Sequence, residues 1–203
     1  MKRAIDSNVL IYNGMHSKVI ALDKLNLAIK IFPVRLEYNA MKEYELLQLL
    51  NQSKIKCVPK IYGIVKAENA IILVKEYIQG EYFSDFIEKR GVIEVANMFK
   101  KLLECLHKID KIGVTIKELS TPRKNIIVKN GEPFIIDLER WVQEAKKTNV
   151  TQFIGFLYKA MLRNDEIGSK IRKIINEENL LAAAKEYKTR IRIDRIIKSI
   201  FKV

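Results

Sequence analysis

The chain contains Leu27-Ala28-Ile29-Lys30 and, much further along, Asn125-Ile126-Ile127-Val128 and Phe134-Ile135-Ile136-Asp137. In this order, a lysine lies within an apolar strand, an asparagine precedes a second apolar segment, and an aspartate ends a third. A lysine on a strand can pair with nucleotide phosphates, while a carboxamide and a carboxylate can hold the metal ion that neutralises them. The three stretches together indicate a nucleotide-phosphate site in an α+β fold.

Residues 1–77 predict a five-stranded antiparallel sheet with one helix. Five short runs have the apolar pattern of strands, and turn residues such as Asn13-Gly14 separate them. These runs are Val9–Tyr12, Lys18–Leu22, Leu27–Phe32, Lys60–Val65 and Ala70–Val74. After the third run, residues 34–51 repeat apolar positions at three- and four-residue steps, which is typical of a helix.

Residues 78–203 predict a reduced, mainly helical second part. An Asn130-Gly131 turn joins two short strands, Asn125–Val128 and Phe134–Ile136, since this dipeptide favours a tight hairpin. Helical periodicity covers most of the remainder. The predicted helices are Tyr82–Glu88, Glu94–Ile109, 149–163, 165–176, 178–187 and 190–202.

Lys30 and Glu43 are predicted to form a buried ion pair. A lysine in the middle of an apolar strand must reach solvent or find an anion, because burying an unpaired ammonium is costly. Glu43 is the carboxylate on the apolar stripe of the following helix, and Glu45 is a competing partner that helical spacing places off that stripe. Such a pair would aim the lysine at phosphate.

The amino-acid composition limits which kinds of protein this chain can be and which partners it can attract. The formal net charge of +13 attracts nucleotides, nucleic acid or acidic surfaces, although a Lys- and Ile-rich composition could equally reflect coding bias. No apolar run approaches the roughly 20 residues of a membrane span. Cys57 and Cys105 are expected to be reduced core residues of a cytoplasmic protein, and two histidines make a zinc site improbable.

These motifs resemble the protein-kinase-like superfamily over about residues 8–140. The closest likeness is to small predicted archaeal serine/threonine kinases related to the RIO/Bud-type atypical kinases. The resemblance implies a two-lobed fold, with a mainly β N-lobe at residues 1–77 and a reduced helical C-lobe at 78–203. It also implies ATP and Mg²⁺ (or Mn²⁺) as cofactors, and transfer of the γ-phosphoryl group to a protein Ser/Thr hydroxyl, including autophosphorylation.

The resemblance assigns roles residue by residue. Lys30 and Glu43 match the phosphate-binding lysine and its helix partner, Glu118 the catalytic acid, and Asn125 and Asp137 the metal ligands. The resemblance also implies contacts with the cofactor in three further motifs. These motifs are the phosphate loop with its single glycine, the strand before the lysine and the interlobe hinge. These positions are Gly14, Ser17, Val19, Ala28, Glu76 and Ile78.

The chain also departs from the family pattern. Ile116-Lys117-Glu118 replaces His-Arg-Asp, and Glu118 lies seven residues before Asn125, where the usual spacing is five. Glu139 replaces the glycine that follows the metal-binding aspartate by two positions, and Lys75 stands where the family has an apolar gatekeeper. The alternatives are therefore a nucleotide-binding pseudokinase or ATPase switch, a basic scaffold for RNA or a ribonucleoprotein, and a small-molecule phosphotransferase.

Overall fold

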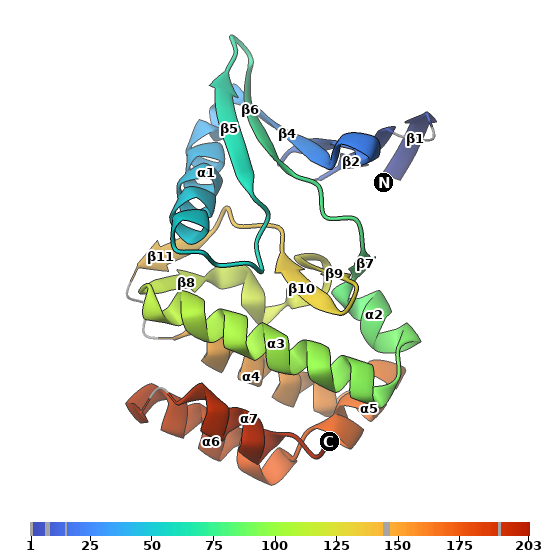
Figure 1. Ribbon diagram of the computed structural model, residues 1–203, viewed down its shortest axis with the longest axis vertical. Helices are drawn as coiled ribbons and strands as arrows, with labels where there is room; N and C mark the ends of the chain where they lie inside the picture. The colour runs from blue at the N-terminus through green and yellow to red at the C-terminus, as the bar shows by residue number, and fades with distance from the viewer. Residues whose placement is uncertain (1, 7–8, 15, 144–146, 191) are drawn as a thin grey trace. The chain divides into compact units, whose positions relative to one another are not determined.

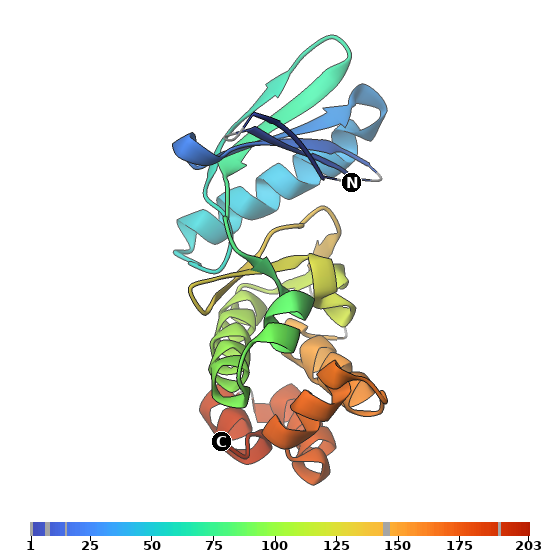
Figure 2. The same cartoon turned by 90° about the vertical axis from the view of Figure 1, so that its right-hand side faces the viewer.

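The computed structural model describes residues 2–6, 9–14, 16–143, 147–190 and 192–203, apart from the side chains of residues 2–6, 118 and 188–190. The chain divides into two compact units (Figures 1 and 2). The first contains residues 1–79 and 134–140, and the second contains residues 80–133 and 141–203. The segment 134–140 thus joins a unit from which it is distant in sequence.

The first unit is built on a six-stranded antiparallel sheet of order β1-β2-β3-β4-β6-β5. Its strands are β1 (Lys2–Asp6), β2 (Val9–Asn13), β3 (Lys18–Leu22), β4 (Leu27–Pro33), β5 (Ile61–Lys66) and β6 (Ala70–Glu76). All five predicted strands form. The sixth strand, β1, was not predicted, because its run Lys-Arg-Ala-Ile-Asp carries almost no apolar alternation.

Helix α1 (Glu37–Gln52) follows the short 3₁₀ turn Val34–Leu36 and packs on strands β4, β5 and β6. Alternate residues of β4 and β6 are buried on one face of the sheet, as a period of two requires. Phe32, Ile71 and Leu73 of these strands form a core with Ala40 of the helix. The buried stripe of α1 therefore carries Glu43 into the same core.

The second unit contains six helices and short strands in its described residues. The helices are α2 (Phe83–Lys89), α3 (Val92–Lys111), α4 (Asn149–Met161), α5 (Glu166–Ile174), α6 (Glu177–Arg190) and α7 (Ile193–Ile200). Each corresponds to a predicted helix. Their core includes a cluster of four phenylalanines, Phe83, Phe99, Phe153 and Phe156. In the part of the chain described, no helix has both the length and the apolar run needed to cross a membrane.

The remaining strands are short, and β10 (Glu132–Ile135) begins in the second unit and ends in the segment that belongs to the first. They form one sheet of order β10-β9-β7 and a pair of β11 with β8. Their bounds are β7 (Glu81–Tyr82), β8 (Val114–Ile116), β9 (Ile126–Lys129), β10 (Glu132–Ile135) and β11 (Trp141–Gln143). Asn130 and Gly131 have φ of 52° and 76°, the positive values that a tight hairpin between β9 and β10 requires.

A buried polar network fixes the position of β8. Asn149 is fully buried; it accepts a hydrogen bond from the Ile116 N–H (2.8 Å) and donates one to the Val114 carbonyl (2.7 Å). Asp110 accepts from the N–H of Asn149 (2.7 Å) and from the Tyr187 hydroxyl (2.9 Å). Burial raises the pKa of the Asp110 carboxyl despite these bonds. The network anchors the start of the loop that carries residue 118.

The expectation of reduced cysteines is wrong. Cys57 and Cys105 are both disulfide-bonded, so neither is a free thiol. A disulfide depends on proximity in space, and spacing along the chain does not indicate that proximity.

We predict that Gly168→Ala destabilises the protein and that Gly155→Ala does not. A Cβ at Gly168 of α5 would lie 2.7 Å from the Ala160 carbonyl oxygen, a backbone atom that cannot move aside cheaply, whereas a Cβ at Gly155 of α4 would meet nothing within 4 Å. Urea unfolding should show a loss of about 1–3 kcal/mol for the first change. The second should be neutral or stabilise by up to about 1 kcal/mol. Equal effects would contradict the packing of α5 against the end of α4.

Candidate functional site

Lys30 of β4 is the centre of a buried ionic cluster in the first unit. Its Nζ lies 2.6 Å from Glu43 Oε2, 2.7 Å from Glu139 Oε1 and 3.3 Å from Asp137 Oδ1. Lys75 of β6 forms a further ion pair with Glu43. We call Lys30, Lys75, Glu43, Asp137 and Glu139 the Lys30 cluster. The predicted pairing of Lys30 with Glu43 is present, and Glu45, the competing partner, is exposed.

Sheet register places both lysines on the face that α1 covers. Lys30 is opposite Leu73 in the β4–β6 pair, and Lys75 is opposite Ala28. Because side chains alternate along a strand, residues 28, 30 and 32 share a face with residues 71, 73 and 75. Lys75 therefore occupies a position that the pattern reserves for a core residue, and its small neighbour Ala28 leaves room for it.

Lys75 links three segments of the first unit. Besides its ion pair with Glu43, its Nζ donates to the Ile136 carbonyl at 2.9 Å. Ile135 N–H donates to the Cys57 carbonyl at 2.8 Å, which gives the 134–140 segment a second attachment. These bonds position the segment so that Asp137 and Glu139 reach Lys30. The sequence analysis gave Lys75 no role in the site. The strand alternation of Ile71, Leu73 and Lys75 nevertheless indicated that Lys75 lies on the buried face.

Lys30 and Glu43 stabilise each other's charged forms. Burial alone would lower the pKa of Lys30, but Glu43, Asp137 and Glu139 together raise that pKa well above its ordinary value. Burial would raise the pKa of Glu43, but Lys30 and Lys75 lower it below its ordinary value. Three carboxylates face two ammonium groups, so the cluster carries one excess negative charge.

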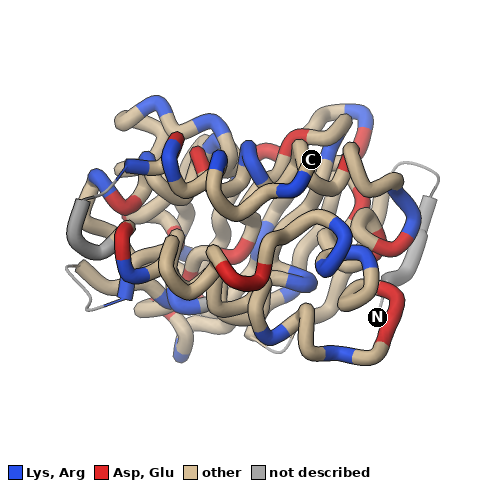
Figure 3. Tube along the Cα trace, turned by 90° about the horizontal axis from the view of Figure 1, so that it is seen from below, with Lys and Arg blue, Asp and Glu red and all other residues tan. Residues whose placement is uncertain are grey.

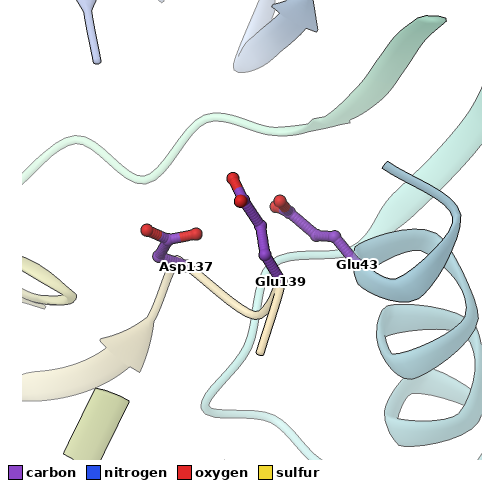
Figure 4. Close-up of side chains that lie close together, drawn as sticks. All are labelled: Glu43, Asp137 and Glu139. Carbon is purple, nitrogen blue, oxygen red and sulfur yellow. The ribbon is translucent and has the colours of Figure 1, made fainter. Parts of the chain in front are cut away.

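The three carboxylates could also act as metal ligands. Oxygens of Glu43, Asp137 and Glu139 all lie within 4.8 Å of one another, and their side chains converge (Figure 4). Carboxylate oxygens are the donors that Mg²⁺ and Mn²⁺ prefer. Asp137 has 42% of its side chain exposed, against 10% for Glu139 and 0% for Glu43. Asp137 is thus the carboxylate that solvent reaches most readily, and the donor set fits a hard divalent cation.

The predicted cofactor-binding residues of the first unit lie on β3, β4 and β6 and in the segments next to these strands. Val19 of β3 is opposite both Tyr12 and Lys30, so the three residues form one row across the sheet. Gly14 N–H donates to the Ser17 carbonyl at 2.9 Å and closes the turn between β2 and β3.

The hinge segment Glu76–Ile78 ends β6. Glu76 N–H donates to the Lys60 carbonyl at 2.8 Å, Tyr77 N–H donates to the Asn26 carbonyl at 2.9 Å, and Ile78 is buried. The hydroxyls of Tyr12 and Tyr77 lie 3.0 Å apart, a contact that the sequence did not predict. The hinge is therefore fixed to the sheet from both sides.

Two predicted site residues belong to the second unit. Glu118 lies in the 3₁₀ turn Lys117–Ser120, and its side chain is outside the described part of the structure. Asn125 follows the 3₁₀ turn Pro122–Lys124 and is half-buried, with its N–H donating to the Pro122 carbonyl at 3.1 Å. Of the residues assigned to catalysis and metal binding, the described structure groups Lys30, Glu43 and Asp137, and it adds Lys75 and Glu139.

The basic charge of the second unit is dispersed. Its sequence contains 24 Lys and Arg against 15 Asp and Glu. Figure 3 shows the basic residues of the whole chain spread along the trace, with acidic residues between them. Ion pairs such as Arg195 with Glu186 (3.2 Å) further neutralise this surface. A nucleic-acid surface therefore gains no specific support from the described residues.

We predict that Lys75→Met lowers stability far more than Lys66→Met. The first change leaves Glu43 with one ammonium partner and leaves the Ile136 carbonyl without this donor, and one missing buried partner costs about 1–3 kcal/mol. Lys66 pairs with Glu37 at the surface, where the loss should be about 0–1 kcal/mol. Urea unfolding of both variants at neutral pH measures the difference, and equal losses would contradict a structural role for Lys75.

The lowered pKa of Glu43 predicts a specific loss of stability in acid. A carboxyl whose folded pKa lies below its unfolded value of 4.5 contributes stability that is present above pH 4.5 and disappears as pH falls through the folded pKa. The free energy of unfolding should therefore decrease below pH 4.5 in the wild type. Glu43→Gln should show a shallower pH slope in that window, despite lower stability at pH 7. An identical slope would show that Glu43 titrates normally.

Two comparisons with known proteins provide no further guide to this site. A scan against protein-family models found no matching family, and a search of curated proteins found no match either. The functional argument therefore depends on the geometry of the Lys30 cluster and on the sequence motifs around it.

Proposed function

We propose that the protein is an ATP- and Mg²⁺-dependent atypical serine/threonine kinase with a two-lobed, protein-kinase-like fold. The observation that carries this proposal is a buried lysine bound to a helix glutamate and to an aspartate from a distant segment. Protein kinases use this combination of groups to hold nucleotide phosphates and their metal ion. The six-stranded sheet with α1 on one face and the helical second unit are compatible with the two lobes.

In this proposal each side chain has a defined task. Lys30, positioned by Glu43, binds the α- and β-phosphates, and Asp137 with Glu139 holds the divalent cation. That cation, when bound, neutralises the charge of the polyphosphate. Glu118 orients the acceptor hydroxyl and takes its proton. The hydroxyl oxygen forms a bond to the γ-phosphorus as the bond to the bridging β–γ oxygen breaks, and ADP leaves.

Backbone and small side chains would hold the rest of the nucleotide. Ala28 and Val19 flank Lys30 on β4 and β3 and could cover the adenine ring. The backbone of Glu76 and Ile78 would contact the adenine, and the Glu76 N–H already donates to the Lys60 carbonyl. Gly14 and Ser17, in the turn between β2 and β3, could approach the phosphates.

A nucleotide-binding switch without transfer is the second candidate. It is favoured because Lys30, Glu43 and Asp137, which bind phosphate and metal, come together within one unit. The acceptor-orienting segment, by contrast, departs from the kinase pattern at Ile116-Lys117-Glu118 and in its spacing to Asn125. Positioning and charge neutralisation dominate phosphoryl transfer, so the departure weakens transfer more than binding.

We predict that Asp137→Ala and Glu118→Gln separate binding from transfer. The measurements are thermal stabilisation by ATP with Mg²⁺ and incorporation of the labelled γ-phosphoryl group into the protein or a generic Ser/Thr substrate. Asp137→Ala should lose both responses. Glu118→Gln should keep the stabilisation and lose transfer about 10²–10⁴-fold. Glu68→Gln is the control, because Glu68 is exposed in the turn between β5 and β6.

The other outcomes discriminate between the candidates. Stabilisation without any transfer in the wild type would establish the nucleotide-binding switch. If Glu118→Gln transfers the phosphoryl group as fast as the wild type, Glu118 has no catalytic role. If the wild type shows no stabilisation and no transfer, the ATP site is excluded. The remaining candidate is then RNA binding by the basic surface, and the affinity for RNA should fall steeply between low and moderate salt.

A further inference from the structure

Glu139 forms an ion pair with Lys30, the residue that would bind phosphate in the proposed site. Its Oε1 accepts from Lys30 Nζ at 2.7 Å, a shorter contact than the 3.3 Å from the same ammonium to Asp137. Its Oε2 lies 3.4 Å from Asn39 Nδ2, an amide of α1 that orients the carboxylate toward the lysine. The Glu139 side chain is 10% exposed, so this ion pair is largely shielded from water.

A nucleotide phosphate and Glu139 would compete for the same ammonium. The Lys30 ammonium can donate three hydrogen bonds, and three carboxylates already accept them. Glu43 would remain bound, because it is fully buried and also holds Lys75. A phosphate that binds Lys30 must therefore displace Glu139 or Asp137. Of these two carboxylates, Glu139 makes the shorter and more buried contact with the Lys30 ammonium.

Charge opposes the entry of a metal-free polyphosphate. The Lys30 cluster already has one excess negative charge, and a nucleotide triphosphate would add several more in a shielded site. A divalent cation that binds Asp137 and Glu139 supplies two positive charges and removes both carboxylates from competition for Lys30. Phosphate binding to the lysine then becomes favourable.

We infer that Glu139 is a specificity-determining residue that makes the site accept the divalent metal–nucleotide complex and reject the free nucleotide. The inference rests on the proposed function and extends it by naming the form of nucleotide selected. It assigns a role to the residue that replaces a glycine in the kinase pattern. A glycine there would leave Lys30 one carboxylate fewer and the cluster without its excess negative charge.

The test is the binding of ADP by calorimetry, with Mg²⁺ or with EDTA, to the wild type, Glu139→Gln and Glu139→Asp. The wild type should bind ADP with Mg²⁺ and lose most of its affinity in EDTA. Glu139→Gln should bind ADP in EDTA about tenfold or more tightly than the wild type, because the competing charge is gone while the amide keeps the shape. Glu139→Asp keeps the charge and should retain the metal dependence.

The controls keep the test independent of folding and of the proposed function. Glu37→Gln removes a surface carboxylate that pairs with Lys66 and should leave ADP affinity unchanged in both buffers. Asn39→Ala, which leaves all five charges in place, should raise metal-free affinity by a smaller factor. Unchanged or weaker metal-free binding in Glu139→Gln, beside normal Mg²⁺-dependent binding by the wild type, would overturn this inference alone. No ADP binding by the wild type in either buffer would overturn the proposed function as well.

Discussion

The structure of the first unit depends on one constraint, the burial of Glu43 at 0% exposure between two ammonium groups. A carboxylate with no access to water must be paired, and its partners must come from elements that pack around it. Lys30 and Lys75 satisfy this requirement from adjacent strands, so α1, β4 and β6 are fixed relative to one another. Lys75 also binds the Ile136 carbonyl, which extends the constraint to the 134–140 segment.

The two lysines that pair with Glu43 differ in their further partners. Lys75 neutralises Glu43 and holds the helix against the sheet. In the proposed function, Lys30 would exchange Asp137 or Glu139 for a phosphate and keep Glu43, which Lys75 also pairs. The exchangeable partners are Asp137 and Glu139, which come from the edge of the unit where solvent reaches Asp137. The cluster thus combines a fully buried pair, Glu43 with Lys75, and a more exposed part in which Lys30 meets Asp137.

Local periodicity explains which site residues could be predicted. The helical stripe of residues 34–51 selected Glu43 over Glu45, and strand alternation placed Lys30 inside, because each rule concerns neighbours a few residues apart. The same alternation applied to Lys75, but a lysine at that position was interpreted only as a departure from a resembling family. Glu139 was likewise interpreted as a lost glycine. Its contact with Lys30 spans over a hundred residues, and no local rule describes such a pair.

By itself the sequence determined the five strands, the inserted helix, the helical second part and the Lys30–Glu43 pair, because apolar period and turn residues act locally. Tertiary structure alone decided the edge strand β1, the disulfide bonding of the cysteines and the grouping of residues 134–140 with the first unit. It also decided that five charged groups, four of them largely buried, share one site. Such proximity depends on how the chain returns to the sheet, which is a property of the packed fold and not of any short stretch of residues.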